Sequence, residues 1–206
     1  MNEAQSARLV RMQERYRTGD MPWDAELPPP EVIALVDRLA PGRLIDLGCG
    51  TARASLFLAE HGWQADGVDF VPEAIAMAQR RVADAGLEQR VRLHVASVTD
   101  LGFLDPPYDL AIDVGCFHGM EPDEQQRYAA EVARMLRPGA LFLLFAYLHQ
   151  HGSELLPVST AAGSVEACFD ADFTVAGVVY GETSVEGHWA SAWYELIRRG
   201  EVRGAE

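Results

Sequence analysis

Cysteine is scarce in this chain. The 206 residues include three, Cys49, Cys116 and Cys168, and an odd number of widely separated cysteines does not supply a disulfide framework. None of them stands at a metal-ligand spacing from histidine or another cysteine. We therefore expect neither a disulfide scaffold nor a metal site, and a reducing cytoplasm is the natural setting for such a protein.

Long hydrophobic runs and a secretion signal are also missing. The longest uninterrupted apolar run, Ala140 to Tyr147, is too short to cross a bilayer. Polar Asn2, Glu3 and Gln5 stand where a signal peptide would begin its apolar core. We expect a soluble cytoplasmic protein that does not associate with membranes.

Positive charge is in short supply. Lysine and arginine together number 17 against 31 aspartates and glutamates, so the formal net charge is −14. A polyanion would be repelled by most of such a surface, and no run of basic residues forms a local stripe to overcome the repulsion. The composition argues against nucleic acid as a partner and favours a small-molecule substrate.

The chain does have enough apolar residues for a sizeable core, at 49% of its length. No stretch is composed like a linker, so we expect a single domain over residues 1–206, with an N-terminal segment at 1–30 and an α/β core at 31–206. Strands are predicted near 43–47, 64–69, 91–95, 109–114 and 140–146, and helices near 3–17, 31–39, 52–61, 73–85 and 122–136. This alternation predicts a doubly wound, mostly parallel sheet.

The end of the chain departs from the alternation. Residues 172–180 and 188–198 both have strand composition, and Gly181 and Gly187 fall in the short loop expected between them. We expect a hairpin at the edge of the sheet, with the last strand antiparallel to the others.

A glycine loop is the strongest local signal. The apolar strand at 43–47 contains Asp46 and leads into Gly48-Cys49-Gly50, where the backbone can turn sharply and approach a ligand closely. A dinucleotide fingerprint requires a third glycine where Arg53 stands. A carboxylate at Asp46 would repel a pyrophosphate but favour the sulfonium and ammonium groups of S-adenosylmethionine. The alternative is an ordinary strand-to-helix turn that binds nothing.

The segment from Asp46 to Ala52 resembles the first motif of class I S-adenosylmethionine-dependent methyltransferases, D-x-G-x-G-x-G, with Ala52 in place of the last glycine. The resemblance implies a Rossmann-like sheet of seven strands. It also implies that Gly48, Cys49 and Gly50 cradle the cofactor.

A second acidic residue ends the next strand. Asp69 follows Asp46 by 23 residues, at the strand tip where a carboxylate accepts hydrogen bonds from a ribose. We expect Asp69 to bind the ribose and Phe70 to lie near the adenine. Asp69 as an N-cap for the helix near Pro72 is the alternative, and Asp66 is a weaker candidate because it lies inside the strand.

The third and fourth strands complete the predicted site. In the family, the end of the third strand flanks the adenine, where Ser97 replaces the usual acid and Val98 follows; for the nearby Asp100 we favour a capping role. The fourth strand ends at Asp113 and Val114, which we expect at the methionine end of the cofactor.

Phe117, His118 and Tyr147 are the predicted acceptor contacts. Methyl transfer chiefly requires alignment of nucleophile and methyl group, so no catalytic side chain is obligatory. For an alcohol or amine acceptor, His118 is the candidate base. A thiolate or halide needs none, and His118 then merely lines the pocket or bonds to the backbone.

The segment from Tyr16 to Asp24, continuing through Pro28 to Glu31, resembles the W/Y-x-x-G-x-x-P-W-D-x-x-x-P-x-P segment of the thiopurine, halide and thiol methyltransferase group, to which tellurite-resistance methyltransferases are related. The resemblance implies that the first helix and the Pro22-Trp23 loop cover the cofactor as a lid. Trp23 would then contact both the sulfonium and the acceptor. The alternative is that Trp23 only anchors the first helix in the core.

A further motif resembles one from another group of methyltransferases but lies on the wrong side of the fourth strand. The tetrapeptide from Asp105 to Tyr108 resembles the active-site motif of adenine and glutamine amino-methyltransferases. In those enzymes the motif follows the fourth strand, whereas here it precedes the apolar run at 110–112, and we interpret it as a turn.

Together these features predict an S-adenosylmethionine-dependent methyltransferase, active as a monomer or homodimer, that methylates a small soft nucleophile such as a thiol, a halide or a chalcogen. Two alternatives stay open. One is an O- or N-methyltransferase of a small natural product that uses His118 as a base, and the other is a protein that binds S-adenosylmethionine without transferring its methyl group.

Overall fold

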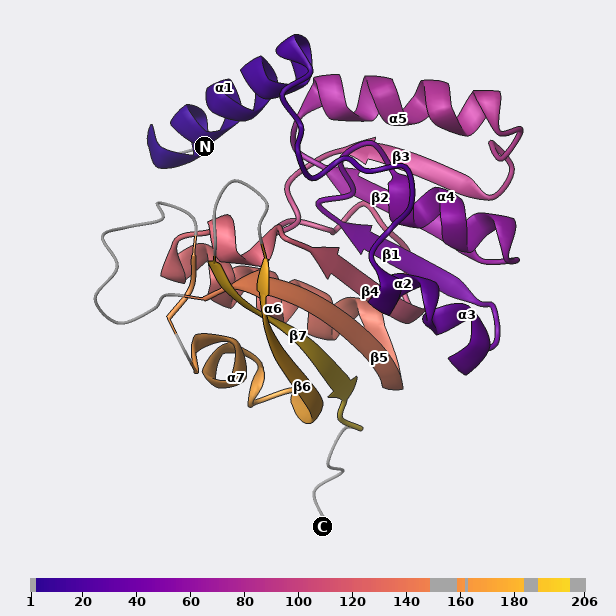
Figure 1. Ribbon diagram of the computed structural model, residues 1–206. Coiled ribbons are helices and arrows are strands. Elements are labelled where there is room, and N and C mark those ends of the chain that lie inside the picture. The colour runs from indigo at the N-terminus through magenta and orange to yellow at the C-terminus, as the bar shows by residue number, and fades with distance from the viewer. Residues whose placement is uncertain (1–2, 149–158, 162, 184–188, 201–206) are drawn as a thin grey trace. The chain divides into compact units, whose positions relative to one another are not determined.

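The computed structural model describes residues 3–148, 159–161, 163–183 and 189–200 (Figure 1). The chain divides into two compact units, residues 1–98 and 99–206. Seven strands follow the order β3-β2-β1-β4-β5-β7-β6. This is the α/β sheet that the sequence predicted, mostly parallel and with an antiparallel last strand.

The first unit alternates helices and strands. Its elements are α1 (Glu3–Thr18), α2 (Pro30–Ile33), α3 (Leu35–Arg38), β1 (Arg43–Leu47), α4 (Arg53–Glu60), β2 (Gln64–Asp69), α5 (Pro72–Asp84) and β3 (Val91–Val95). The strands are parallel, and the register pairs Asp46 with Gly67 and Asp69 with Val95. The carboxyl ends of β1 and β2 therefore lie side by side, which brings the glycine loop next to Asp69.

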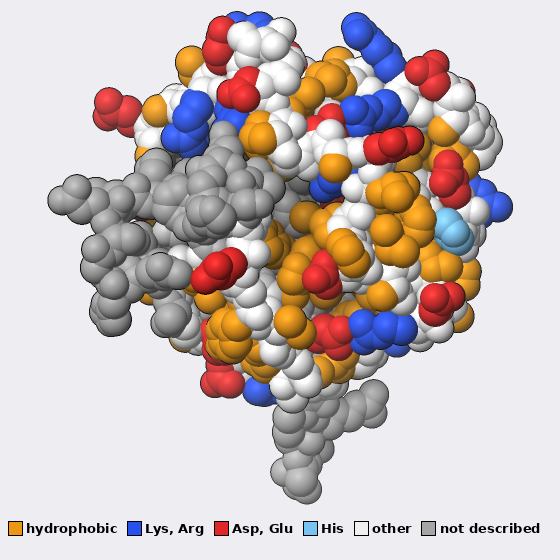
Figure 2. Space-filling view, in the orientation of Figure 1, with side chains coloured by type: hydrophobic (Ala, Val, Ile, Leu, Met, Phe, Trp, Pro, Cys, Tyr) orange, Lys and Arg blue, Asp and Glu red, His pale blue; other side chains and the backbone are white. Residues whose placement is uncertain are grey.

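Helix α1 packs against α5 (Figure 1). Tyr16 is buried with Val71 and Ala74, and the predicted apolar face of α1, Leu9 and Met12, packs against them. At the rim, Glu73 accepts hydrogen bonds from the Gln13 amide at 3.1 Å and from Arg17 at 3.2 Å. In the upper part of Figure 2, over α1 and α5, arginines are interspersed with acidic side chains.

One expected helix is interrupted. The sequence predicted a single helix over 31–39, but the structure divides it at Ala34 into α2 and α3. No side-chain hydrogen bond caps the start of α2, and the β-branched residues Val32, Ile33 and Val36 weaken a helix that lacks such a cap.

The second unit contains β4 (Tyr108–Val114), the 3-10 turn η1 (Phe117–Gly119), α6 (Pro122–Met135), β5 (Leu136–Tyr147), α7 (Ser164–Phe169), β6 (Phe173–Thr183) and β7 (Trp189–Arg198). Helix α6 begins with a capping box, in which Glu121 and Glu124 each accept a hydrogen bond from the other's backbone N–H, and with Pro122 in its first turn. Strand β4 begins at Tyr108, so residues 105–107 precede the strand as expected.

The final hairpin has the predicted directions. Strand β7 runs antiparallel to both β5 and β6. It lies between those two strands, so β6, and not the last strand, is at the edge of the sheet. Gly181 belongs to β6 and not to a loop, and Gly187 lies outside the described residues. The six-residue helix α7 was not predicted, because it is too short to show a helical period.

Among the residues that the structure describes, none of the helices combines the length and the apolar composition that crossing a membrane requires.

Candidate functional site

The glycine loop bends sharply over the end of β2. Gly48, Gly50 and Ala52 all have positive φ values, 73°, 55° and 63°, in the region that glycine enters most readily. The backbone N–H groups of Gly48 and Cys49 both donate to the Val68 carbonyl, at 2.8 and 3.1 Å. The loop is thus fastened to the neighbouring strand before α4 begins at Arg53.

Asp69 joins the loop to the tip of β2. One carboxylate oxygen accepts a hydrogen bond from the Gly50 N–H and the other from the Val71 N–H, both at 2.9 Å. Burial raises the pKa of Asp69 to about 6, although these backbone hydrogen bonds oppose the shift. The side chain is therefore an ionised, rigidly held acceptor at neutral pH. The N-cap of α5 is Val71, so Asp69 does not cap that helix directly.

Asp46 is buried and hydrogen-bonded to α4. Its carboxylate is 3% exposed and accepts a hydrogen bond from the Ser55 hydroxyl of α4 at 2.6 Å. Burial raises the pKa of Asp46 to about 6. The sequence suggested a carboxylate directed at the ligand, whereas in the structure it connects β1 to α4 beneath the loop.

Tyr16 was not among the individual residues predicted to form the site. A Cβ added to Gly50 would meet its hydroxyl at 3.1 Å, so the hydroxyl touches the glycine loop. Burial, with the nearby Asp69 carboxylate, raises the pKa of Tyr16, and a hydrogen bond with the Trp23 side chain opposes the shift. Its place as the first residue of the Tyr16–Asp24 segment was the signal that could have identified it.

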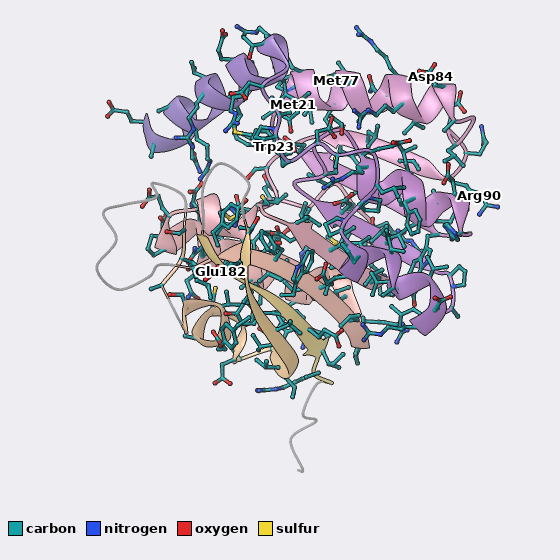
Figure 3. The ribbon with its side chains drawn as sticks, viewed as in Figure 1. Met21, Trp23, Met77, Asp84, Arg90 and Glu182 are labelled. Atoms are coloured by element: carbon teal, nitrogen blue, oxygen red, sulfur yellow. The ribbon has the colours of Figure 1, made fainter. Side chains whose placement is uncertain are left out.

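Trp23 follows α1 and is half-buried, with its ring edge-on to Tyr16 at 6.3 Å between centroids. The guanidinium of Arg15 lies 4.3 Å above the indole, so a cation already covers one face of the ring. Met21 and Met77 pack in the same cluster (Figure 3).

The predicted adenine contacts are less enclosed. Phe70 is half-buried beneath the guanidinium of Arg8, which lies 5.6 Å from the ring centroid. Ser97 is exposed and Val98 is buried. The Ala96 N–H donates to the Asp69 backbone carbonyl at 3.0 Å, so the end of β3 lies beside the tip of β2.

In the second unit, Asp113 organises the turn after β4. Its carboxylate is fully buried and accepts hydrogen bonds from the N–H groups of Cys116 and Phe117, at 2.6 and 3.0 Å, and from the Tyr128 hydroxyl at 2.7 Å. Burial raises the pKa of Asp113 to about 7. These three donors occupy the carboxylate that the sequence placed at the methionine end of the cofactor. Its neighbour Val114 is half-buried.

Tyr128→Phe is expected to lower the free energy of unfolding by about 1–3 kcal/mol, because Oδ2 of the buried Asp113 carboxylate loses one of its two donors and keeps only the Phe117 N–H. The Tyr128 hydrogen bond holds the pKa of Asp113 down, so the loss should be larger at pH 8.5, where Asp113 is ionised, than at pH 5.5. Urea denaturation at the two pH values measures the difference. An equal loss at both would contradict an interaction with the charged carboxylate.

The turn places Phe117 and His118 in different surroundings. Phe117 is fully buried, with its ring against Tyr128 and Phe169 at 5.8 and 5.5 Å between centroids. Phe117 is therefore a core residue, without the exposed surface that the predicted contact with the acceptor requires. The ring of His118 instead lies 4.5 Å from that of the half-buried Tyr147.

His118 is buried and neutral. Its Nδ1 accepts a hydrogen bond from the Tyr147 N–H at 3.3 Å. Burial lowers the pKa of His118 to about 4, although a backbone hydrogen bond with Phe145 opposes the shift. The Tyr147 N–H favours the tautomer in which Nδ1 accepts and Nε2 carries the ring proton, whereas the hydrogen bond with the Phe145 backbone requires a ring N–H as its donor.

The strand order, the antiparallel seventh strand, the glycine loop after β1 and the carboxylate at the tip of β2 are features of the Rossmann-like α/β fold of class I S-adenosylmethionine-dependent methyltransferases. Residues 44–139 match the protein-family model described as "Methyltransferase domain".

Among curated proteins, the chain is 32% identical over 127 residues to a 2-heptyl-1-hydroxyquinolin-4(1H)-one methyltransferase of Mycobacteroides abscessus. It is 27% identical over 112 residues to a norajmaline N-methyltransferase of Rauvolfia serpentina. These matches cover 61% and 54% of this chain, and 56% and 38% of the relatives. The chain thus spans about half the length of the curated relatives it matches, or less.

Solved structures are similar over more of the chain. One is the subject of "Conversion of a Disulfide Bond into a Thioacetal Group during Echinomycin Biosynthesis", with 25% identity, a TM-score of 0.77 and 93% of each chain covered. The 1,6-didemethyltoxoflavin-N1-methyltransferase of Burkholderia thailandensis is 21% identical, with a TM-score of 0.74 and 97% and 92% covered. TehB of Haemophilus influenzae is 14% identical, with a TM-score of 0.71 and 84% and 63% covered. The last two support the fold alone.

The first unit has the chemical groups that suit S-adenosylmethionine, the cofactor of this class. Asp69 is a fixed, ionised acceptor of the kind that binds ribose hydroxyls. At Gly50, an added Cβ would lie 3.1 Å from the Tyr16 hydroxyl, a tight contact at a backbone conformation that favours glycine. The half-buried apolar rings of Phe70 and Trp23 offer surfaces to a nucleoside and a thioether. These residues fit the cofactor, and Asp69 is the one whose geometry is most specific.

Proposed function

We propose that this chain transfers a methyl group from S-adenosylmethionine to a nitrogen or oxygen atom of a small organic molecule. The observation that carries the choice of acceptor is the buried, neutral imidazole of His118 after β4. A thiolate or halide needs no such group, whereas a hydroxyl or amine gains from a hydrogen-bonding partner that orients its lone pair. The names of the two curated relatives, a hydroxyquinolone methyltransferase and an alkaloid N-methyltransferase, support the same choice.

Within this proposal, each described residue has a limited task. The cofactor, when bound, supplies an electrophilic methyl carbon attached to a positively charged sulfur. Asp69 accepts hydrogen bonds from the ribose, and the glycine loop lets backbone N–H groups approach the cofactor. Trp23 and Phe70 cover apolar parts of it, while Ser97 and Val98 flank the adenine.

We assign His118 as an orienting donor and not as a base. In the tautomer that the Tyr147 N–H favours, Nε2 carries a proton that it can donate to a lone pair of the acceptor molecule other than the one that attacks, and the acceptor's own proton is lost to solvent. A pKa of about 4, lowered by burial, keeps the ring neutral across the physiological range. Tyr147, whose ring lies beside that of His118, is the proposed apolar wall for the acceptor.

Sulfur is the second candidate acceptor. It is favoured by the 25% identity, over 93% of both chains, to the structure whose subject is the conversion of a disulfide bond into a thioacetal group. A halide or chalcogen acceptor is supported only by the similarity in fold to TehB.

An acceptor panel tests the proposal. The protein, used as residues 1–206 and as the monomer or homodimer that it forms, is incubated with S-adenosylmethionine and hydroxyquinolones, phenols, heteroaromatic amines, simple thiols or iodide, and S-adenosylhomocysteine is quantified. We expect at least one oxygen or nitrogen acceptor to react about tenfold faster than any thiol or iodide. Turnover of thiols alone would favour the sulfur candidate. Tight S-adenosylhomocysteine binding without turnover of any acceptor would favour a non-catalytic binding protein.

A further inference from the structure

Three polar side chains from distant parts of the first unit meet beside the glycine loop. Asp24 follows α1, Thr51 lies in the loop, and Arg81 lies on α5. The carboxylate of Asp24 receives both terminal nitrogens of the Arg81 guanidinium, at 3.0 and 2.7 Å. Thr51 donates to Asp24 at 2.6 Å and accepts from Arg81, also at 2.6 Å. Every member of this cluster therefore contacts the other two.

Burial makes the cluster more than a surface ion pair. The Asp24 side chain is 7% exposed and Thr51 is 4% exposed, whereas Arg81 is 39% exposed. A carboxylate that is withdrawn from water depends on its partner, because a buried charge left unpaired is strongly unfavourable. Two parallel N–H···O bonds also fix the direction of the guanidinium, which a single contact would not do.

The segment that carries Asp24 has few other attachments to the loop. Arg53 donates to the Leu27 carbonyl at 3.0 Å, and the Tyr16 hydroxyl touches Gly50. Within the segment, the Asp24 N–H donates to the Met21 carbonyl at 2.9 Å, which closes a turn around Trp23. Asp24 is thus the charged link between this turn and the loop.

We propose that Asp24 and Arg81 are positioning residues for the cofactor: through Thr51 they clamp the Met21–Asp24 turn onto the glycine loop, and so hold Trp23 and Tyr16 at the cofactor. Neither residue needs to touch the cofactor for this role. The inference rests on the proposed cofactor-dependent function, but the clamp itself is a property of the free protein and can be tested there.

The first test uses the protein without ligand. Hydrogen exchange followed by mass spectrometry on peptides covering residues 19–29 should show exchange at least about tenfold faster in Asp24→Asn than in wild type, because local opening no longer breaks a buried ion pair. Unchanged exchange in a folded variant would overturn the proposal, whether or not the protein binds a cofactor.

The second test measures S-adenosylhomocysteine binding by calorimetry, in which the stoichiometry reports the folded fraction. Asp24→Asn and Arg81→Gln should each raise the Kd by about tenfold or more at unchanged stoichiometry. The double variant should bind no more weakly than the weaker single variant, because each single change already removes the ion pair between Asp24 and Arg81. Additive losses in the double variant, or Kd values within about twofold of wild type, would overturn the proposal.

Matched controls separate the clamp from general effects of charge. Asp123→Asn removes an exposed carboxylate that pairs with Arg127 at 3.2 Å on α6 and should leave the Kd within about twofold of wild type. If Asp24→Asn does not fold, Thr51→Val replaces the hydroxyl with a methyl group and should still raise the Kd about threefold.

Steady-state kinetics give a further readout. For Asp24→Asn and Arg81→Gln at saturating S-adenosylmethionine, kcat should stay near the wild-type value while KM for the cofactor rises. Failure of the wild-type protein to bind S-adenosylhomocysteine would instead contradict the proposed function.

Discussion

Replacing Asp69 with asparagine is expected to weaken S-adenosylhomocysteine binding by about 100-fold, or about 2.7 kcal/mol. The two carboxylate oxygens accept from the N–H groups of Gly50 and Val71. An amide offers only one oxygen, so its NH2 group would face one of these two donors. The variant therefore loses an acceptor for the ribose and disturbs the glycine loop as well. Calorimetry at pH 7.5 measures the effect.

The pH dependence of binding provides a second check on Asp69. Burial raises its pKa to about 6, and binding requires the ionised carboxylate, so wild-type affinity should fall about tenfold between pH 7.5 and pH 5. The pKa of Asp46 is also raised by burial to about 6. Asp69→Asn separates the two groups, because its affinity should change little over this range. If the affinity of Asp69→Asn depends on pH as strongly as that of the wild type, a group other than Asp69 is responsible for the titration.

Asp66→Asn is the matched control. Asp66 lies on the same strand and is also buried, but it pairs with Arg92 and His94 of β3, at 2.7 and 2.9 Å. The change removes the carboxylate acceptor of Arg92 and His94 and should lower stability while leaving the Kd for S-adenosylhomocysteine within about threefold of wild type. A loss of affinity as large as that of Asp69→Asn would contradict the special role of the strand tip.

His118→Ala is expected to lower kcat/KM for a nitrogen or oxygen acceptor by about 100-fold, whereas His118→Gln should stay within about tenfold of wild type. The glutamine amide can present an N–H near the position of Nε2 but cannot act as a base. The comparison therefore distinguishes an orienting donor from proton abstraction. Steady-state formation of S-adenosylhomocysteine with the best acceptor measures both variants.

The pH profile of the wild-type enzyme tests the same assignment. Burial lowers the pKa of His118 to about 4, so its ionisation should leave no limb in kcat/KM between pH 6 and pH 8. Two results would instead support His118 as a general base. One is a His118→Gln variant as impaired as His118→Ala, and the other is a limb near pH 6.5 in the wild-type profile that disappears in His118→Ala.

Local sequence signals predicted the fold and the geometry of the glycine loop. Positive φ at Gly48 and Gly50 was foreseeable from their residue type, and the position of Asp69 next to the loop follows from its place at the tip of the second strand in this type of sheet. These features depend on neighbours within a few residues, or on a strand pairing that the topology fixes.

Features that depend on distant packing were not predictable. Asp24 and Arg81 are 57 residues apart, and although Asp24 belongs to a segment that resembles a known group, nothing in the sequence pairs it with Arg81. Asp46 looked like a ligand because its position before the loop was visible, while its bond to Ser55 was not. Phe117 and His118 are adjacent, yet only the folded turn shows that one is a core residue and the other lies against Tyr147.

Ala52 gives the loop a narrow mutational tolerance. It is the only non-glycine residue with positive φ in the described chain, and it is fully buried. Alanine in this conformation carries about 1–2 kcal/mol of backbone strain, which glycine would relieve. A larger side chain would add to that strain and would also need room in a closed core. Substitution at this position is therefore confined almost entirely to exchange between alanine and glycine, so the departure from D-x-G-x-G-x-G is one of the few that the loop accepts.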